Sequence, residues 1–171
     1  MEIFKNKKAA IYAIMTLIAV LILYIFIFVT SVKDMRESKI EYTDLTYMEL
    51  TVKDVRSVYH SDDGYKYYIS VNESDKTVFV NDLLAKSDIR KGLDALDDNE
   101  KIYCYAKEDG TRYNAVEIKT DNDTVLSIEE YRYIYRKNAL LGFIAIPIIL
   151  VLFISSALIR DKWFQKNRIE E

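Results

Sequence analysis

Two long uncharged apolar stretches, one near each end of the chain, limit what this sequence can fold into more than any other feature. The first covers residues 9–32 and the second covers residues 138–159, which is 24 and 22 residues without a charged side chain. An α-helix rises about 1.5 Å per residue and the hydrocarbon core of a bilayer is about 30 Å thick, so about 20 apolar residues span it. We therefore predict that both stretches are transmembrane helices.

The average composition hides this pattern. The chain has 171 residues, of which 50% are hydrophobic and 30% are charged, and its mean hydropathy of −0.07 is typical of a soluble protein. The average arises because the charged residues lie between and outside the two stretches. Four glycines, one proline and one cysteine exclude collagen-like, low-complexity and disulfide-scaffold classes.

The first stretch also has the beginning of a signal peptide, because Lys5, Lys7 and Lys8 precede it. The apolar region of a signal peptide is about 7 to 15 residues long, which is shorter than this stretch. Only Val29-Thr30-Ser31 resembles a cleavage site. We therefore predict an uncleaved signal anchor.

The orientation of the chain follows from lysines and arginines close to the span ends, which favour the cytoplasmic side. Both outer ends carry such residues: Lys5, Lys7, Lys8, Arg160, Lys162, Lys166 and Arg168. Segment 33–137 has 17 basic and 23 acidic residues, a net charge of −6. Basic residues at the inner ends weaken the signal without reversing it: Lys33, Arg36, Arg136 and Lys137. We predict a plasma-membrane protein with both termini in the cytoplasm and the central segment outside.

The predicted organisation has seven segments. They are a cytoplasmic tail 1–8, a transmembrane helix 9–32, a stalk 33–46, an extracytoplasmic β domain 47–126, a helix 127–137 leading into the membrane, a second transmembrane helix 138–159 and a cytoplasmic tail 160–171. The outer segment is long enough to bury a core of its own. A single cysteine forms no internal disulfide, so this domain is held by packing. Twelve of the fourteen tyrosines lie in segment 33–137, which we attribute to β propensity.

Alternating apolar and polar residues predict five strands in the β domain. The first, Tyr47 to His60, changes phase between Val52 and Val55, which indicates a long strand with a bulge. The others are expected at 65–71, 77–80, 101–107 and 112–119.

Between the third and fourth strands the apolar period becomes helical. Leu84, Ile89, Leu93 and Leu96 predict one or two helical turns, with Ser87 or Asp88 as N-cap. The order β-β-β-α-β-β is that of an OB-fold, so we predict a mainly-β, OB-like small barrel. Segment 33–137, with a net charge of −6, lacks the basic surface that binding to a phosphate backbone needs. We therefore exclude nucleic acid as a partner.

A helix is predicted to start at Ser127, because Glu130 three residues later completes a capping box. Nothing breaks this helix before the second apolar stretch. The run Val125–Asn138 (VLSIEEYRYIYRKN) resembles the entry into the second span of small uncharacterised membrane proteins of Gram-positive bacteria. In those proteins two transmembrane helices flank an extracytoplasmic β domain. The resemblance implies a bacterial plasma-membrane protein and supplies no activity.

One set of residues suggests nucleophilic chemistry. His60, Cys104 and Arg112 are the residue types that sortases use, which are membrane-anchored transpeptidases. Such a thiolate needs a nearby base or cation to lower its pKa. Sortase barrels are considerably larger than segment 33–137, and the Thr-Leu-x-Thr-Cys run expected before the nucleophile is absent.

The strand register also opposes this set. A two-residue turn at Asp109-Gly110 pairs Cys104 with Ala115 and Lys107 with Arg112. Side chains alternate between faces, so Arg112 is expected on the face opposite Cys104 unless a bulge changes the parity. We therefore interpret Cys104 as a small apolar core residue.

No other constellation points to catalysis or to a cofactor. One histidine and one cysteine do not supply a zinc site of the usual kind, and no glycine-rich phosphate loop occurs. The acidic runs lie at predicted turns and lack the spacing of an EF-hand: Asp62-Asp63, Asp97-Asp98 and Asp121-Asn122-Asp123. We expect no enzymatic activity and no catalytic, cofactor-binding or metal-binding residue.

The two apolar stretches carry features that suggest packing partners. Small residues on the second stretch, Ala139, Gly142 and Ala145, allow close approach of another helix. That helix is either the first stretch of the same chain, through Tyr24, Phe26 and Phe28, or one from a partner. Three tyrosines are expected to anchor the chain at the membrane interface: Tyr131, Tyr133 and Tyr135.

These observations leave three functional hypotheses. The first is a non-enzymatic membrane protein that presents an interaction or sensing domain outside, with the Ser127 helix coupling it to the second span. The second is an accessory subunit of a transporter or envelope complex. The third is a Cys104-dependent transpeptidase. The expected partners are the lipid bilayer and either another membrane protein or a second copy of the chain.

Overall fold

A computed structural model describes residues 2–61, 64–81 and 83–169. Within these ranges the side chains of residues 2–10, 12, 13, 60, 87, 154 and 156–169 are not described. The chain forms two compact units. We call residues up to Met35 and from Lys137 onward the helical unit, and Arg36–Arg136 the barrel unit. The predicted turn at Asp62-Asp63 lies outside the described residues.

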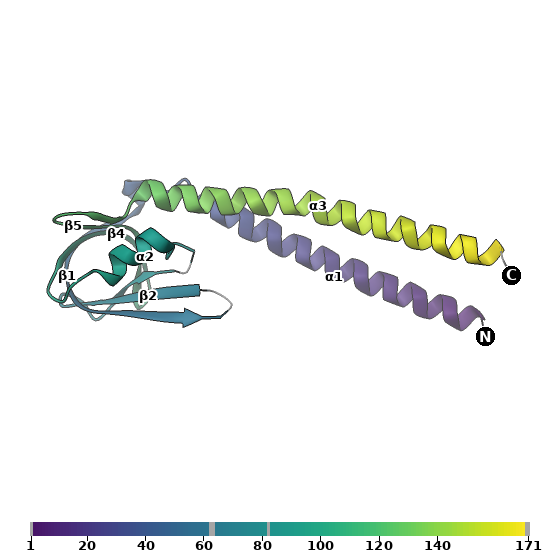
Figure 1. Cartoon of the computed structure of the whole chain (residues 1–171), viewed down its shortest axis with the longest axis horizontal. Coiled ribbons are helices and arrows are strands. Elements are labelled where there is room, and N and C mark those ends of the chain that lie inside the picture. Colours follow the sequence, from purple (N-terminus) through teal and green to yellow (C-terminus); the bar gives the residue numbers. More distant parts are fainter. Residues whose placement is uncertain (1, 62–63, 82, 170–171) are drawn as a thin grey trace. The chain divides into compact units, whose positions relative to one another are not determined.

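Two long helices contribute to both units: α1 (Glu2–Glu37) and α3 (Ile128–Ile169) (Figure 1). Within the described residues, their parts Ile14–Glu37 and Ile128–Phe153 are long and apolar enough to cross a membrane, and almost none of their most apolar residues are buried. Phe26, for example, is 66% exposed. The chain therefore carries two long apolar helices, one on each side of the barrel in the sequence.

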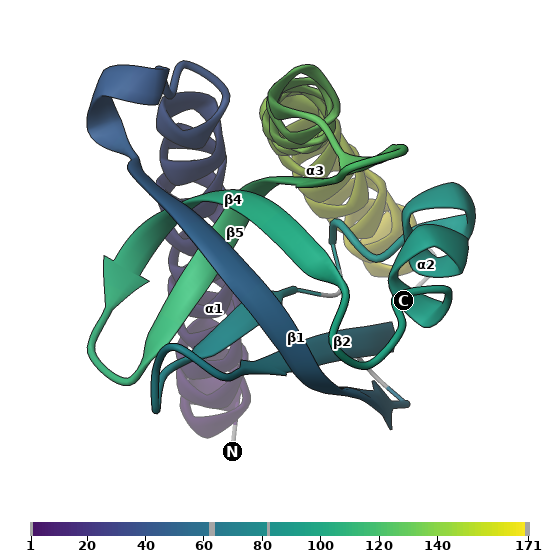
Figure 2. The same cartoon turned by 90° about the vertical axis from the view of Figure 1, so that its left-hand side faces the viewer.

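Six strands form the sheet of the barrel unit. They are β1 (Thr46–His60), β2 (Gly64–Val71), β3 (Thr77–Val80), β4 (Lys101–Asp109), β5 (Arg112–Thr120) and β6 (Thr124–Leu126). β1 pairs antiparallel with β2 and β4, β2 with β3, and β4 with β5. A parallel pairing of β3 with β5 closes five strands into a barrel (Figure 2), and β6 pairs antiparallel with β5.

The OB-like prediction is confirmed at the level of topology. Helix α2 (Ser87–Asp94) lies between β3 and β4 in the chain, as the sequence predicted. β1 carries the predicted bulge, since its register against β2 shifts between Val52 and Asp54. The bulge separates the half of β1 that pairs with β4 from the half that pairs with β2. β6 is an addition to the predicted strands.

The core of the barrel unit consists of side chains from the inner faces of the strands and from the α2 region. Leu84, Ile89, Leu93 and Leu96, whose spacing predicted the helix, are all buried. Gly92 lets α2 lie close to β6, because a Cβ at this position would lie 3.0 Å from Val125 Cγ1. The glycine that weakens α2 intrinsically therefore serves its packing.

Two local predictions are wrong in detail. The helix α2 begins at Ser87, its N-cap position is Lys86, and no side chain caps it. The helix starts one residue earlier than an N-cap at Ser87 would place it, and two residues earlier than an N-cap at Asp88 would. The reason is that the backbone N–H of Arg90 already donates to the Lys86 carbonyl, at 2.7 Å. Asp88, the other predicted N-cap, lies in the first turn of the helix, with its Oδ1 3.5 Å from Lys91 Nζ.

The hairpin register between β4 and β5 also differs. Asp109 pairs with Arg112, so the loop is Gly110-Thr111, and Cys104 pairs with Ile118 instead of Ala115. Gly110 has a φ of +55°, which suits the first position of a two-residue hairpin loop. A bulge at the step from Tyr105 to Ala106 supplies the further shift, and the Asp-Gly pair alone does not reveal it.

Candidate coupling site at the ends of the two long helices

The last residue of α1 is tied to two other elements of the barrel unit. The Glu37 carboxylate accepts hydrogen bonds at Oε2 from Lys107 Nζ of β4, at 2.6 Å, and from the Tyr131 hydroxyl of α3, at 2.7 Å. Tyr131 is only 5% exposed, so its hydroxyl needs a partner inside the fold. A charged acceptor with two donors makes this a strong contact for its size.

A second contact joins the same two helices. Arg132 donates from Nε and Nη2 to the backbone carbonyl of Ile40, at 2.8 and 2.5 Å. Ile40 lies just past the end of α1, where carbonyl groups have no partner within the helix, and an arginine satisfies such groups well. The first turns of α3 therefore hold the end of α1 through both a side chain and the backbone.

Glu117 provides the third contact, on the outer wall of β5. It is 1% exposed, and its Oε2 accepts from the Tyr42 hydroxyl at 2.8 Å and from the Ile128 backbone N–H at 3.3 Å. Tyr42 opens the short 3-10 helix η1 (Tyr42–Asp44), which follows α1, and Ile128 is the first residue of α3. One buried carboxylate thus links β5 to the segments next to both long helices.

The charge of Glu117 is balanced within the fold. Its Oε1 lies 2.7 Å from Lys119 Nζ in a contact with the geometry of an ion pair and not of a hydrogen bond. Burial raises the pKa of Glu117, but Lys119, Tyr42 and the Ile128 N–H outweigh it and the pKa lies below its ordinary value. Burial and the Glu117 carboxylate raise the pKa of Tyr42 to about 12, so this hydroxyl stays a donor.

The start of α3 is fixed by its own cap. The Ser127 hydroxyl accepts from the Glu130 N–H at 3.1 Å, and the Glu130 carboxylate accepts from the Ser127 N–H at 3.1 Å. The predicted capping box is therefore confirmed. Together with Glu37, Arg132 and Glu117 it forms what we call the coupling site, which lies entirely within the barrel unit.

The three tyrosines expected at a membrane interface have different roles. Tyr131 is buried and binds Glu37, and the Tyr135 hydroxyl accepts from Asn81 Nδ2 at 2.8 Å. The two rings also contact each other, with centroids 4.6 Å apart. Because they lie four residues apart, both face the barrel unit, and only Tyr133, at 65% exposure, has the exposed ring of an anchor.

Of the suggested nucleophilic set, the structure does not bring Cys104 and Arg112 together. Cys104 is fully buried in the barrel, where burial and then the Glu117 charge raise its thiol pKa to about 12. Arg112 stacks on the Phe79 ring, at 4.5 Å, and lies 3.5 Å from Asp109. It pairs with Asp109, five residues along β4 from Cys104. The side chain of His60 lies outside the described residues.

In the helical unit, the small-residue face of α3 meets α1 of the same chain. A Cβ added to Gly142 would overlap the Ser31 hydroxyl and lie 3.7 Å from Ile27. The sequence suggested Tyr24, Phe26 and Phe28 for this contact. Ile27 and Ser31 make it instead because they lie four residues apart on one helix face, whereas Phe28 meets Phe143 edge to face at 6.2 Å.

Three of the residues that build the coupling site carried no signal in the sequence. Glu117 follows the alternation of β5 as an outward position and resembles a solvent-facing charge. Glu37 and Lys107 lie in ordinary charged runs.

Among the described residues there is no cluster of three or more metal-ligating side chains. Comparisons of the chain with protein-family models, curated proteins and solved structures found no match.

Proposed function

We propose that the chain is a bacterial plasma-membrane protein whose two long helices span the bilayer, with both termini in the cytoplasm and the barrel outside. The barrel serves as an interaction or sensing module and not as an enzyme. The exposed apolar side chains of α1 and α3, such as Phe26, support the membrane part, because lipid is the environment that covers such residues without a partner.

The hydrogen bonds to the Glu37 carboxylate are the main support for a sensing or interaction role. A domain attached by a flexible linker would move independently of its anchors, whereas here β4 and α3 both bind the end of α1 through one carboxylate. A change in the barrel would therefore act on both helices where they leave it. A sensing module needs such an arrangement if a ligand that binds to the barrel is to change the position of the transmembrane helices.

An accessory subunit of a transporter or envelope complex is the second candidate. It is favoured by the exposed apolar residues of the helices, which a neighbouring helix can cover as well as lipid. Gly142 already contacts Ser31 of the same chain, so a partner helix would bind elsewhere on α1 or α3.

Crosslinking in intact cells, followed by purification from membranes and mass spectrometry, separates the two candidates. A self-contained module is recovered alone or crosslinked to itself. A membrane protein recovered in stoichiometric amount would instead support the accessory subunit. A substitution at an exposed apolar position of a helix, such as Leu152→Trp, provides a control. It should reduce the recovery of a membrane partner if the chain is an accessory subunit, and it should change nothing if the chain is a self-contained module.

A further inference from the structure

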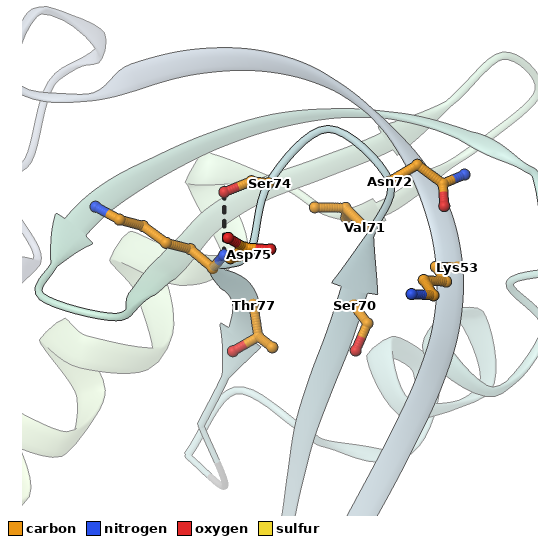
Figure 3. Close-up of a pocket in the computed structure, with 8 residues that line it drawn as sticks. Lys53, Ser70, Val71, Asn72, Ser74, Asp75 and Thr77 are labelled. Carbon is orange, nitrogen blue, oxygen red and sulfur yellow. Dashed lines mark hydrogen bonds between the residues drawn. The ribbon is translucent and has the colours of Figure 1, made fainter.

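A polar cleft opens in the barrel unit where β2 and β3 diverge. Their described ladder ends at the pair Ile69–Val78, and beyond it Ser70 and Thr77 face each other without pairing. The cleft has a volume of about 270 Å³. Figure 3 shows its polar lining, to which Lys53, Ser70, Asn72, Ser74, Asp75 and Thr77 contribute.

The bulge of β1 explains why Lys53 lies at this cleft. Val52 pairs with Val71 and Asp54 with Ser70, so Lys53 is the extra residue of the bulge and has no partner on β2. A bulge changes the direction of a side chain relative to the regular strand. The side chain therefore lines the cleft next to Ser70.

Two opposite charges at the cleft are not neutralised. Within the described part of the chain, neither Lys53 nor Asp75 makes an ion pair or a side-chain hydrogen bond, and they do not pair with each other. The other cation of the lining, Lys76, is paired with Glu108. The cleft thus offers one free cation, one free anion and a set of hydroxyl and amide groups.

We propose that this cleft binds a free α-amino acid, with the ligand carboxylate at Lys53 and the ligand ammonium at Asp75. Such charge-assisted contacts are the strong ones available at a polar surface, and hydroxyl groups complete the shell. A sugar would use the hydroxyls and leave both charges without a partner. A peptide carries its two terminal charges on different residues, too far apart for a cleft smaller than those that hold drug-sized ligands.

The amino acid is then the ligand that the barrel senses. Its sensing role rests on the proposed function, whereas its binding in the cleft does not. The test is a calorimetric titration of the full-length protein in phospholipid nanodiscs with each of the twenty free amino acids. The C-terminal amide and the N-acetyl derivative of any that binds, and glucose, are titrated next. Saturable binding of at least one amino acid is expected, with weaker binding of both derivatives.

Two charge-removing variants assign the contacts. Lys53→Gln should weaken binding of the amino acid about tenfold, so that the amino acid no longer binds more tightly than its C-terminal amide. Asp75→Asn should also weaken binding about tenfold, so that the amino acid no longer binds more tightly than its N-acetyl derivative. Both residues are exposed, so both variants should fold. Lys86→Gln and Asp98→Asn, exposed positions outside the cleft, are the matched controls and should bind as the unmodified chain does.

Three outcomes would overturn the inference. They are no saturable binding of any amino acid, unchanged binding in either cleft variant, and binding of the amide and the N-acetyl derivative that is as strong as binding of the amino acid. None of these depends on which side of the membrane the barrel occupies. A wrong topology would therefore refute the proposed function and leave the titration to decide the cleft separately.

Discussion

The barrel unit and the helical unit treat apolar side chains in opposite ways. In the barrel unit Ile69, Leu93 and Ile102 are essentially inaccessible, and a polar surface covers them. In the helical unit many large apolar side chains are exposed, and Ile22 and Leu152 are 62% and 64% exposed. The barrel therefore supplies its own apolar environment, whereas the helices need one from outside the chain.

The largest expected effect tests this contrast directly. Leu93→Ala should destabilise the barrel by about 3 kcal/mol, because it removes a fully buried side chain and leaves a cavity. Ile22→Ala, on an exposed face of α1, should leave barrel stability unchanged. Urea unfolding of the full chain in detergent, followed by the near-ultraviolet signal of the tyrosines, measures both. Equal losses in the two variants would mean that the units do not differ as described.

The next effect concerns the buried carboxylate on the wall of the barrel. Glu117→Ala should cost about 2 kcal/mol, because the Tyr42 hydroxyl and the Ile128 N–H lose their acceptor. Glu117→Gln keeps an acceptor in place and should cost less. The same urea unfolding ranks the two variants, and an alanine variant as stable as the unmodified chain would show that the coupling site contributes nothing.

A smaller effect is expected at the start of α3. Ser127→Ala removes the cap and should lower stability by about 1 kcal/mol, with faster amide exchange confined to the first turn of the helix. Ser127→Asp keeps a capping oxygen and is the matched control. Hydrogen exchange by mass spectrometry locates the change; uniform exchange across the barrel would contradict a local cap.

The smallest expected effect is a pH dependence. The pKa of Glu117 in the folded chain lies below its unfolded value of 4.5, so its charge stabilises the fold above that pH. This contribution is lost as the pH falls from about 4.5 through the folded pKa. Glu117→Gln should therefore lose less stability than the unmodified chain between pH 5 and the acid limit of folding. If the free energy of unfolding falls by the same amount in the two proteins as the pH is lowered, this assignment is contradicted.

The sequence predicts those parts of the molecule that depend on local patterns. The phase change between Val52 and Val55 gave the bulge, and Ser127 with Glu130 gave the start of α3, because both signals lie within a few residues. The apolar spacing around Leu93 likewise gave α2. The OB-like order followed from placing these elements in sequence.

The coupling site was not predictable in the same way. Glu37 contacts Lys107 and Tyr131, which are 70 and 94 residues away in the chain, and Tyr42 and Glu117 are separated by 75 residues. No local pattern marks such pairs. The hairpin register failed for a related reason, because the bulge beside Tyr105 depends on packing and not on the Asp-Gly turn.

The proposed position of the barrel outside the membrane can be measured directly by cysteine labelling. In a Cys104→Ala background, a single cysteine at exposed Ser57 in the barrel unit is compared with one at Lys166 near the C-terminus. Intact cells are treated with a membrane-impermeant maleimide. We expect labelling at position 57 in intact cells, and labelling at position 166 only after the membrane is permeabilised. Protection at position 57 with labelling at position 166 would contradict the proposed position.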